Sequence, residues 1–205
     1  MTGLGGIHRH IGALPFEIVM AAGVVVMAAQ HDWFHVGTAL FTTVVSFLPL
    51  LVERLFRVYL PAWVQITYVI FVFASMFSGE VLKFYRNVPG WDETMHFMSG
   101  ILVGFAVLLW LGWLENKKQI YPIWLRCLLI ICINMTVAVL WEIVEFASDQ
   151  LFGTTSQDQS LFDTMTDLIY GALGGIVLAI IYTKVVHAKQ SLFMQKIAEF
   201  KVLNK

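Results

Sequence analysis

Residues Leu140–Gly175 read LWEIVEFASDQLFGTTSQDQSLFDTMTDLIYGALGG and place six carboxylates between two long apolar runs. An ionisable side chain at membrane depth costs roughly 2.5–3.5 kcal/mol on insertion scales, so such residues are read first as functional. The apolar runs on either side are long enough to cross about 30 Å of hydrocarbon as helices. This stretch therefore predicts two membrane-spanning helices with an acidic site at one end.

The composition of the whole chain is typical of a membrane protein. Of its 205 residues, 59% are hydrophobic and 13% are charged, and the mean hydropathy is +0.76. These values are far too apolar for a soluble domain. The formal net charge of −1 gives no indication of a nucleic-acid partner. From the apolar composition we expect the protein to contact membrane lipids.

Six apolar runs are expected to cross the membrane as helices, which predicts an all-α, polytopic bundle in a single integral membrane domain, 1–205. The first run is the shortest, and we expect an uncleaved span because it continues directly into the second. Beyond the last run, residues 187–205 mix apolar and basic side chains, which predicts a cytoplasmic amphipathic tail. The six runs are Leu14–Ala29, Phe34–Val52, Ala62–Gly79, Met95–Leu114, Ile123–Ala147 and Leu161–Val186.

The basic residues predict the orientation of these spans. Lysine and arginine concentrate in cytoplasmic segments of membrane proteins. With the N-terminus inside, 11 of the 13 basic residues are cytoplasmic, and only Lys83 and Arg86 fall outside. We therefore expect both termini on the cytoplasmic side (N-in, C-in). The six carboxylates of Leu140–Gly175 then face the outer side of the membrane.

A repeated pattern relates the third and fourth spans to the fifth and sixth. Glu80-Val-Leu-Lys83-Phe84 follows directly after the third span, and the fifth span contains Glu142-Ile-Val-Glu145-Phe146. We infer that helices three–four and five–six are parallel repeated hairpins; the alternative is that short motifs recur by chance in so biased a composition. In both cases two polar residues and two glycines follow at four-residue intervals: Asp92, His96, Gly100 and Gly104, and Asp163, Asp167, Gly171 and Gly175.

If the repeat is real, seven side chains meet in one pocket near the outer surface. Residues four apart lie on nearly one helix face, and the glycines below them let another helix approach closely. So many carboxylates cannot all be ionised without compensation. Histidine with carboxylates is a donor set for Zn²⁺, Mn²⁺ or Fe²⁺, and is less suited to Ca²⁺ or Mg²⁺. The seven are Glu80, Asp92, His96, Glu142, Glu145, Asp163 and Asp167.

Some of these residues also have simpler explanations. Asp92 and Asp163 each open a predicted helix, where a carboxylate caps free N–H groups. His96 by itself is best explained as a hydrogen-bonded core histidine. Glu142 and Glu145 lie near a predicted helix C-terminus, where the dipole disfavours them, so they are the strongest candidates.

Two further segments lie near the predicted pocket. The polar loop of residues 152–160 either covers the pocket or simply connects two spans. His31, Asp32 and His35 in the first outer loop are either surface residues or part of the site.

The motifs Trp91-Asp92-x3-His96-Phe97 and Trp141-Glu142-x2-Glu145, followed by Asp163-x3-Asp167-x3-Gly171, resemble those of YjdF-type bacterial inner-membrane proteins. More distantly, the chain is similar to the VanZ-like family, whose pattern is Asp-x3-His-Phe, then Glu-x2-Gln, then Asp followed by Asn and Gly. Glu145 stands in place of the Gln and Asp167 in place of the Asn, which makes this site more acidic. The resemblance implies an inner-membrane location and a loose link to the cell envelope and glycopeptide resistance.

Three functional hypotheses follow. The first is a metal-dependent enzyme, such as a hydrolase, that acts on a lipid or lipid-linked envelope precursor at the outer leaflet. The second is a cation or proton carrier that uses the acidic pocket, and the third is a non-catalytic protein with a structural ion or a basic partner. In the first hypothesis Glu145 or Asp92 is the general base, and the metal ligands are His96, Glu142, Asp163, Asp167 and Glu80.

Overall fold

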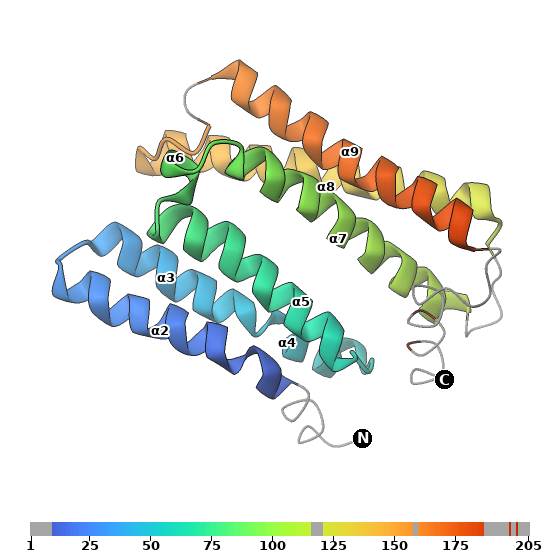
Figure 1. Cartoon of the computed structure of the whole chain (residues 1–205), viewed down its shortest axis with the longest axis horizontal. Helices are drawn as coiled ribbons and strands as arrows, with labels where there is room; N and C mark the ends of the chain where they lie inside the picture. The colour runs from blue at the N-terminus through green and yellow to red at the C-terminus, as the bar shows by residue number, and fades with distance from the viewer. Residues whose placement is uncertain (1–9, 116–120, 158–159, 187–196, 198–199, 201–205) are drawn as a thin grey trace. The chain divides into compact units, whose positions relative to one another are not determined.

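The computed structural model describes residues 10–115, 121–157, 160–186, 197 and 200 (Figure 1). Every regular element in these ranges is a helix, so the predicted all-α class is confirmed. The elements are a 3₁₀ turn η1 (Ile11–Ala13), α2 (Leu14–Ala29), α3 (Trp33–Ser46), α4 (Leu48–Phe56), α5 (Ala62–Val72), the π-helical segment η2 (Phe73–Val81), α6 (Phe84–Asn87), α7 (Trp91–Glu115), α8 (Ile123–Phe152) and α9 (Leu161–Val185).

Six helical stretches of the described chain are long and apolar enough to span a membrane, as the sequence predicts. The first three each join two elements, η1 with α2, α3 with α4, and α5 with η2. Their orientation and the repeated-hairpin arrangement stay predictions, as does the single membrane domain. The spans are Ile11–Ala29, Trp33–Phe56, Ala62–Val81, Trp91–Leu114, Ile123–Phe152 and Leu161–Val185.

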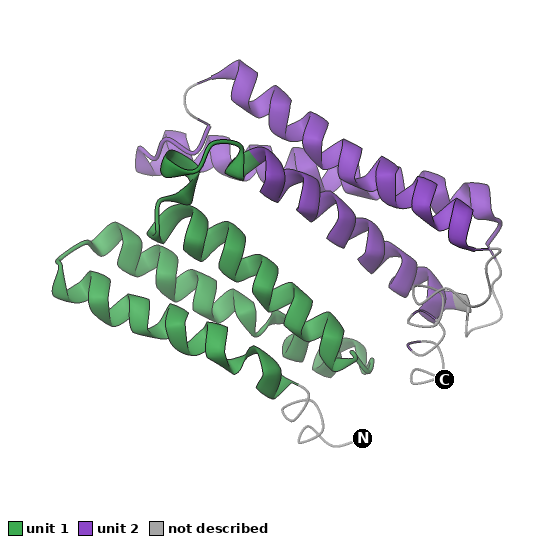
Figure 2. Cartoon of the chain, in the orientation of Figure 1, with its two compact units in different colours: residues 1–92 green, residues 93–205 purple. Residues whose placement is uncertain are grey.

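The chain forms two compact units, residues 1–92 and 93–205 (Figure 2). The division falls within the first turn of α7, so Asp92 is grouped with unit 1 although it lies on the same helix as His96. In unit 1, helices α2, α3 and α5 with η2 pack side by side around Met20, Ala39 and Val69, which are fully buried.

A buried polar network ties the helices of unit 1 together. His10 Nε2 lies 2.6 Å from Glu17 Oε1 on α2, and His10 Nδ1 lies 3.0 Å from Gln65 Oε1 on α5. Ser46 of α3 donates a hydrogen bond of 3.1 Å to the same Glu17 oxygen. All four side chains are buried. These hydrogen bonds offset part of the cost of removing the four polar groups from water, while Oε2 of Glu17 is buried without a hydrogen-bond partner.

Helix α3 begins after an N-cap that links two residues of the first loop. Asp32 accepts hydrogen bonds from the ring Nδ1 of His35 at 2.6 Å and from the His35 backbone N–H at 3.3 Å. These two bonds, the ring contact first, hold the pKa of Asp32 below its ordinary value of 3.8. Asp32 and His35 therefore form a pair within unit 1.

Replacing Asp32 with asparagine is expected to lower the melting temperature at neutral pH but not in strong acid. A pKa that is lower in the folded chain means that the ionised carboxylate stabilises the fold above the unfolded value, and that this contribution is lost as the pH falls through the folded value. Asparagine keeps the cap but carries no charge. Thermal melting of both proteins across this range checks the prediction; a difference that is constant with pH would contradict it.

Unit 2 is built from α7, α8 and α9, with the backbones of α7 and α9 in close contact. A Cβ added at Gly100 would overlap the Gly171 carbonyl and would lie 3.0 Å from the Gly174 Cα atom. Asn134 of α8 is buried and donates a 2.6 Å hydrogen bond to the Gly100 carbonyl. The predicted role of the small residues, to allow close helix approach, is confirmed for these two helices.

Two helices of unit 2 are longer than predicted. Helix α7 begins at Trp91 rather than Met95, so Asp92 lies within its first turn. Helix α8 continues to Phe152 rather than Ala147, and its 30 residues extend about 45 Å, more than the hydrocarbon thickness. Glu142 and Glu145 therefore lie two to three turns before the end of α8. The prediction that they lie at a helix C-terminus, where the helix dipole disfavours a carboxylate, is wrong. The predicted tail, 187–205, lies outside the described residues apart from Ile197 and Phe200.

Candidate metal site

Asp167 lies at the centre of a group of ionisable side chains from α7, α8 and α9. It is on the second turn of α9 and only 2% exposed. Two trios include it, and within each trio one candidate ligand atom from each residue lies within 4.8 Å of the others. The first trio is Asp92, His96 and Asp167; the second is Glu142, Glu145 and Asp167.

The first trio joins the start of α7 to α9. His96 is 8% exposed, and its Nε2 atom lies 3.9 Å from Asp167 Oδ2. This separation is too long for a hydrogen bond between the two atoms. It is closer to the roughly 3.4 Å that separates adjacent ligands of a tetrahedral ion at bond lengths of 2.0–2.1 Å. Asp92 is half-buried one turn before His96, as the four-residue spacing predicts.

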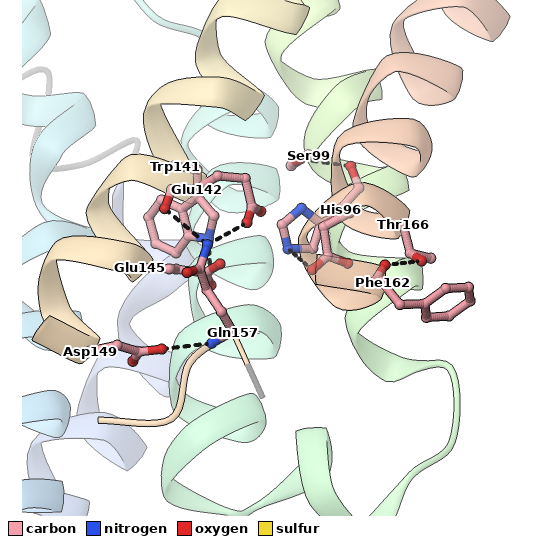
Figure 3. A network of polar contacts seen from close by, with 10 residues as sticks. His96, Ser99, Trp141, Glu142, Glu145, Asp149, Gln157, Phe162 and Thr166 are labelled. Atoms are coloured by element: carbon pink, nitrogen blue, oxygen red, sulfur yellow. Dashed lines mark hydrogen bonds and ion pairs between the residues drawn. The ribbon is translucent and has the colours of Figure 1, made fainter. Parts of the chain in front are cut away.

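The second trio joins α8 to α9, and a loop residue positions it (Figure 3). The amide Nε2 of Gln157 donates to Glu142 Oε2 at 3.2 Å and to the Glu142 carbonyl at 3.3 Å. The indole N–H of Trp141 donates to Glu145 Oε1 at 2.9 Å. Each glutamate thus has one oxygen held by a fixed donor.

The other carboxylate oxygen of Glu142 carries the clearest sign of a ligand. Glu142 is 6% exposed, and its Oε1 atom is buried without a hydrogen-bond partner. Leaving a buried acceptor unsatisfied costs about 1–3 kcal/mol, and more for a charged group. A cation in the second trio would satisfy this oxygen.

The loop that supplies Gln157 is fixed to the end of α8. Asp149 accepts hydrogen bonds from the Thr154 hydroxyl at 2.5 Å and from the backbone N–H groups of Ser156 at 2.8 Å and Gln157 at 3.1 Å. Asp149 therefore holds the loop in place. Gln157 of this loop contacts Glu142, and a role of the loop as a cover over the pocket stays a prediction.

A cavity of ≈ 750 Å³ lies beside Glu142 and between the C-terminal part of α8 and the N-terminal part of α9. Its walls include Ile143, Phe146 and Leu161, while Glu142 and Gln157 contribute polar groups. The cavity thus places apolar side chains next to Glu142.

Two predicted ligands are in neither trio. Asp163 lies on the first turn of α9, where its backbone N–H is capped by Ser160 Oγ at 3.4 Å. Glu80 is in unit 1, with Oε1 3.9 Å from Nε2 of His35. Their assignment as metal ligands stays a prediction. His31, predicted as a third member of the first-loop group, has a left-handed backbone and packs its ring against Trp33.

Four residues with buried or site contacts were not predicted from the sequence: Gln157, Asn134 and the buried pair of His10 and Glu17. Gln157 lies in a polar loop whose composition does not distinguish a contact residue from its neighbours. Asn134 and Glu17 had a usable signal, because each is a lone polar residue within an apolar run.

Comparison with known proteins gives a family but no activity. The family model described as a predicted membrane protein, DUF2238, matches residues 13–188. An uncharacterized protein of Thermotoga maritima is 27% identical over 141 residues, which cover 68% of this chain and 72% of that protein. No solved structure matches. The YjdF-type and VanZ-like resemblance is not confirmed by these matches.

Proposed function

This chain belongs to the DUF2238 family of predicted membrane proteins. From the ionisable side chains gathered around Asp167, we propose that it is a membrane-embedded metalloprotein whose His/carboxylate pocket binds a divalent transition metal. We further propose that the bound metal serves a hydrolytic enzyme that acts on a lipid or lipid-linked envelope precursor. The observation that carries the proposal is the buried Oε1 atom of Glu142, which has no hydrogen-bond partner and belongs to a residue of the trio Glu142, Glu145 and Asp167.

The donor atoms of the pocket fit a transition metal. One imidazole nitrogen with carboxylate oxygens is a common set for Zn²⁺, Mn²⁺ and Fe²⁺. His96, Glu142 and Asp167 are all at least nine-tenths buried, so water does not compete strongly for them. A bound divalent ion would supply Lewis acidity.

The remaining members of the trios are suited to proton transfer. Asp92 and Glu145 are half-buried, whereas the other three members are buried. A general base must exchange its proton with water after each cycle, so a carboxylate with partial access suits that role. We therefore keep Glu145 or Asp92 as the base that deprotonates the attacking water.

The cavity beside Glu142 supports an amphiphilic substrate. Its walls combine apolar side chains of α8 and α9 with the polar groups of Glu142 and Gln157. A substrate that lies in the membrane would place its chain on the apolar wall and its polar group at the trio. A lipid or lipid-linked precursor has this chemistry.

The proposal includes the membrane orientation. We place the protein in the inner membrane with both termini in the cytoplasm, since 11 of the 13 basic residues then lie inside. The acidic pocket in this orientation opens to the extracytoplasmic side. The repeated hairpins of helices three–four and five–six remain part of the proposal on the strength of the shared spacing alone.

Metal content tests the proposal. Elemental mass spectrometry of the purified protein is expected to find a transition metal at near-stoichiometric level, and to find less of it in His96→Ala and in Glu142→Ala/Glu145→Ala. Glu93→Gln, which removes a carboxylate beside Asp92 but outside both trios, is the matched control and should retain the wild-type content. A folded wild-type protein that holds no metal, even after reconstitution, would refute the metalloenzyme.

A further inference from the structure

Asp167 belongs to both trios, so two sets of candidate ligands meet at one carboxylate. A carboxylate has two oxygens and about four lone-pair sites, and it can therefore bind two ions at once. We propose that the pocket binds two divalent transition-metal ions, with Asp167 as the bridging ligand. This inference rests on the proposed function, because it concerns how many ions the same site holds.

The grouping of the ligands supports two positions rather than one. In the part of the chain that the structure describes, the five residues gather as two trios and not as one group of five. Asp92 and His96 come from α7, and Glu142 and Glu145 come from α8, so the two trios draw their unshared ligands from different helices. Each position thus has two ligands of its own and shares the third.

Charge also favours two ions. The trios contain four carboxylates, which carry four negative charges when ionised. Like charges in a buried site repel and need compensation. Two divalent cations neutralise the four carboxylates, whereas one leaves half of the charge uncompensated.

The buried oxygen of Glu142 is an independent indication of the second position. It belongs to the trio without histidine, which by itself would be only a cluster of acids. Gln157 holds the other oxygen of Glu142 at 3.2 Å, so the carboxylate is oriented while Oε1 has no partner. An ion between Glu142, Glu145 and Asp167 would provide that partner.

Known helical carboxylate proteins hold two metal ions with a similarly small set of residues. In such bundles, glutamates and histidines one turn apart on facing helices hold two iron or manganese ions, and the ions of two-metal sites are about 3.5–4 Å apart. Here α7 offers Asp and His four residues apart, and α8 offers two Glu three residues apart. A carboxylate that binds through one oxygen can still accept a proton on the other, so the proposed base role of Asp92 or Glu145 is retained.

The test is the stoichiometry and magnetic coupling of bound Mn²⁺. The full chain, purified in detergent and stripped with a chelator, is equilibrated with Mn²⁺ and passed through a desalting column. Elemental mass spectrometry is expected to give two Mn²⁺ per chain, and electron paramagnetic resonance an exchange-coupled signal.

The variants separate the two positions. His96→Ala and Glu142→Gln/Glu145→Gln change one trio each, so each is expected to bind one Mn²⁺ with the signal of an isolated ion. Asp167→Asn should bind none, and Glu93→Gln should bind two. Elution volume and melting temperature show whether each variant folds, and the two single-trio variants keep the test decisive if Asp167→Asn does not.

A wild type with one Mn²⁺ per chain, lost in both single-trio variants, would overturn the two-ion site and leave the proposed metalloprotein intact. A folded wild type that binds no Mn²⁺ and no other transition metal would overturn both.

Discussion

Gly174→Ala is expected to force helices α7 and α9 apart and to abolish metal binding. The new Cβ would overlap the backbone carbonyl oxygen of Phe97 and would lie 3.0 Å from the Cα atom of Gly100. Overpacking in a core typically costs about 1–3 kcal/mol. Backbone atoms cannot turn aside as a side chain can, so we expect a cost at or above the upper end of this range.

The loss of the site follows from the position of this contact. Phe97 is the residue after His96, and Gly174 lies two turns beyond Asp167 on α9. A displacement of α9 at Gly174 therefore moves Asp167 away from His96. Ligand displacements of this kind weaken metal binding strongly, because metal–ligand distances are tolerated only within a narrow range.

Gly37→Ala is the matched control. Gly37 lies on α3, and nothing is within 4 Å of a Cβ added there. Alanine is favoured over glycine in a helix by about 0.5–1 kcal/mol, so this variant should be as stable as the wild type or slightly more stable. Thermal melting and metal content of the two variants check the prediction. A Gly174→Ala protein with wild-type melting and metal content would show that α7 and α9 are not in close contact.

Asp167→Asn is expected to eliminate the biological activity of the protein while leaving it folded. Asparagine has nearly the same shape as aspartate, so the packing of this buried side chain is preserved. It carries no charge, and both trios lose their shared ligand. Changing residues that only orient metal ligands already costs roughly 10–100-fold in affinity or activity, so removal of a shared ligand should cost more.

The cellular readout separates an enzyme from a carrier. In cells that lack the protein, complementation by the wild type and by Glu93→Gln should restore the lipid composition of the envelope, and complementation by Asp167→Asn should not. Uptake of cations should be the same in all strains. Altered cation uptake with unchanged lipids would favour the carrier hypothesis instead.

The membrane spans were predictable because they depend on composition and length alone. Long apolar runs must form helices in lipid, where every backbone group needs an internal partner. Helix ends were less predictable. Trp91 to Thr94 continue α7 in a polar stretch, and α8 runs past Ala147 to Phe152, because polar residues near the membrane surface extend a helix as readily as they end it. Nothing in the apolar sequence indicates the π-helical turns from Phe73 to Val81.

The candidate site was predictable where the spacing of residues along one helix determines which side chains lie on the same face. His96 and Asp92 are one turn apart, and the glycines that follow His96 and Asp167 bring α7 and α9 together. Spacing along one helix does not decide the neighbours of Glu80. Its local sequence matches that of Glu142, and within unit 1 its Oε1 lies 3.9 Å from Nε2 of His35. Its assignment as a metal ligand stays a prediction, because side-chain neighbours depend on how whole helices pack.

The measurement that tests the central claim most directly is X-ray absorption spectroscopy at the edge of the bound metal. The chain has six histidines and two cysteines, and Cys127 and Cys132 are free thiols, so other sites compete in principle. We predict a first shell of oxygen and nitrogen atoms with outer-shell scattering from imidazole, and loss of the imidazole contribution in His96→Ala. Sulfur ligands, or imidazole scattering that is unchanged in His96→Ala, would place the metal elsewhere and contradict the account.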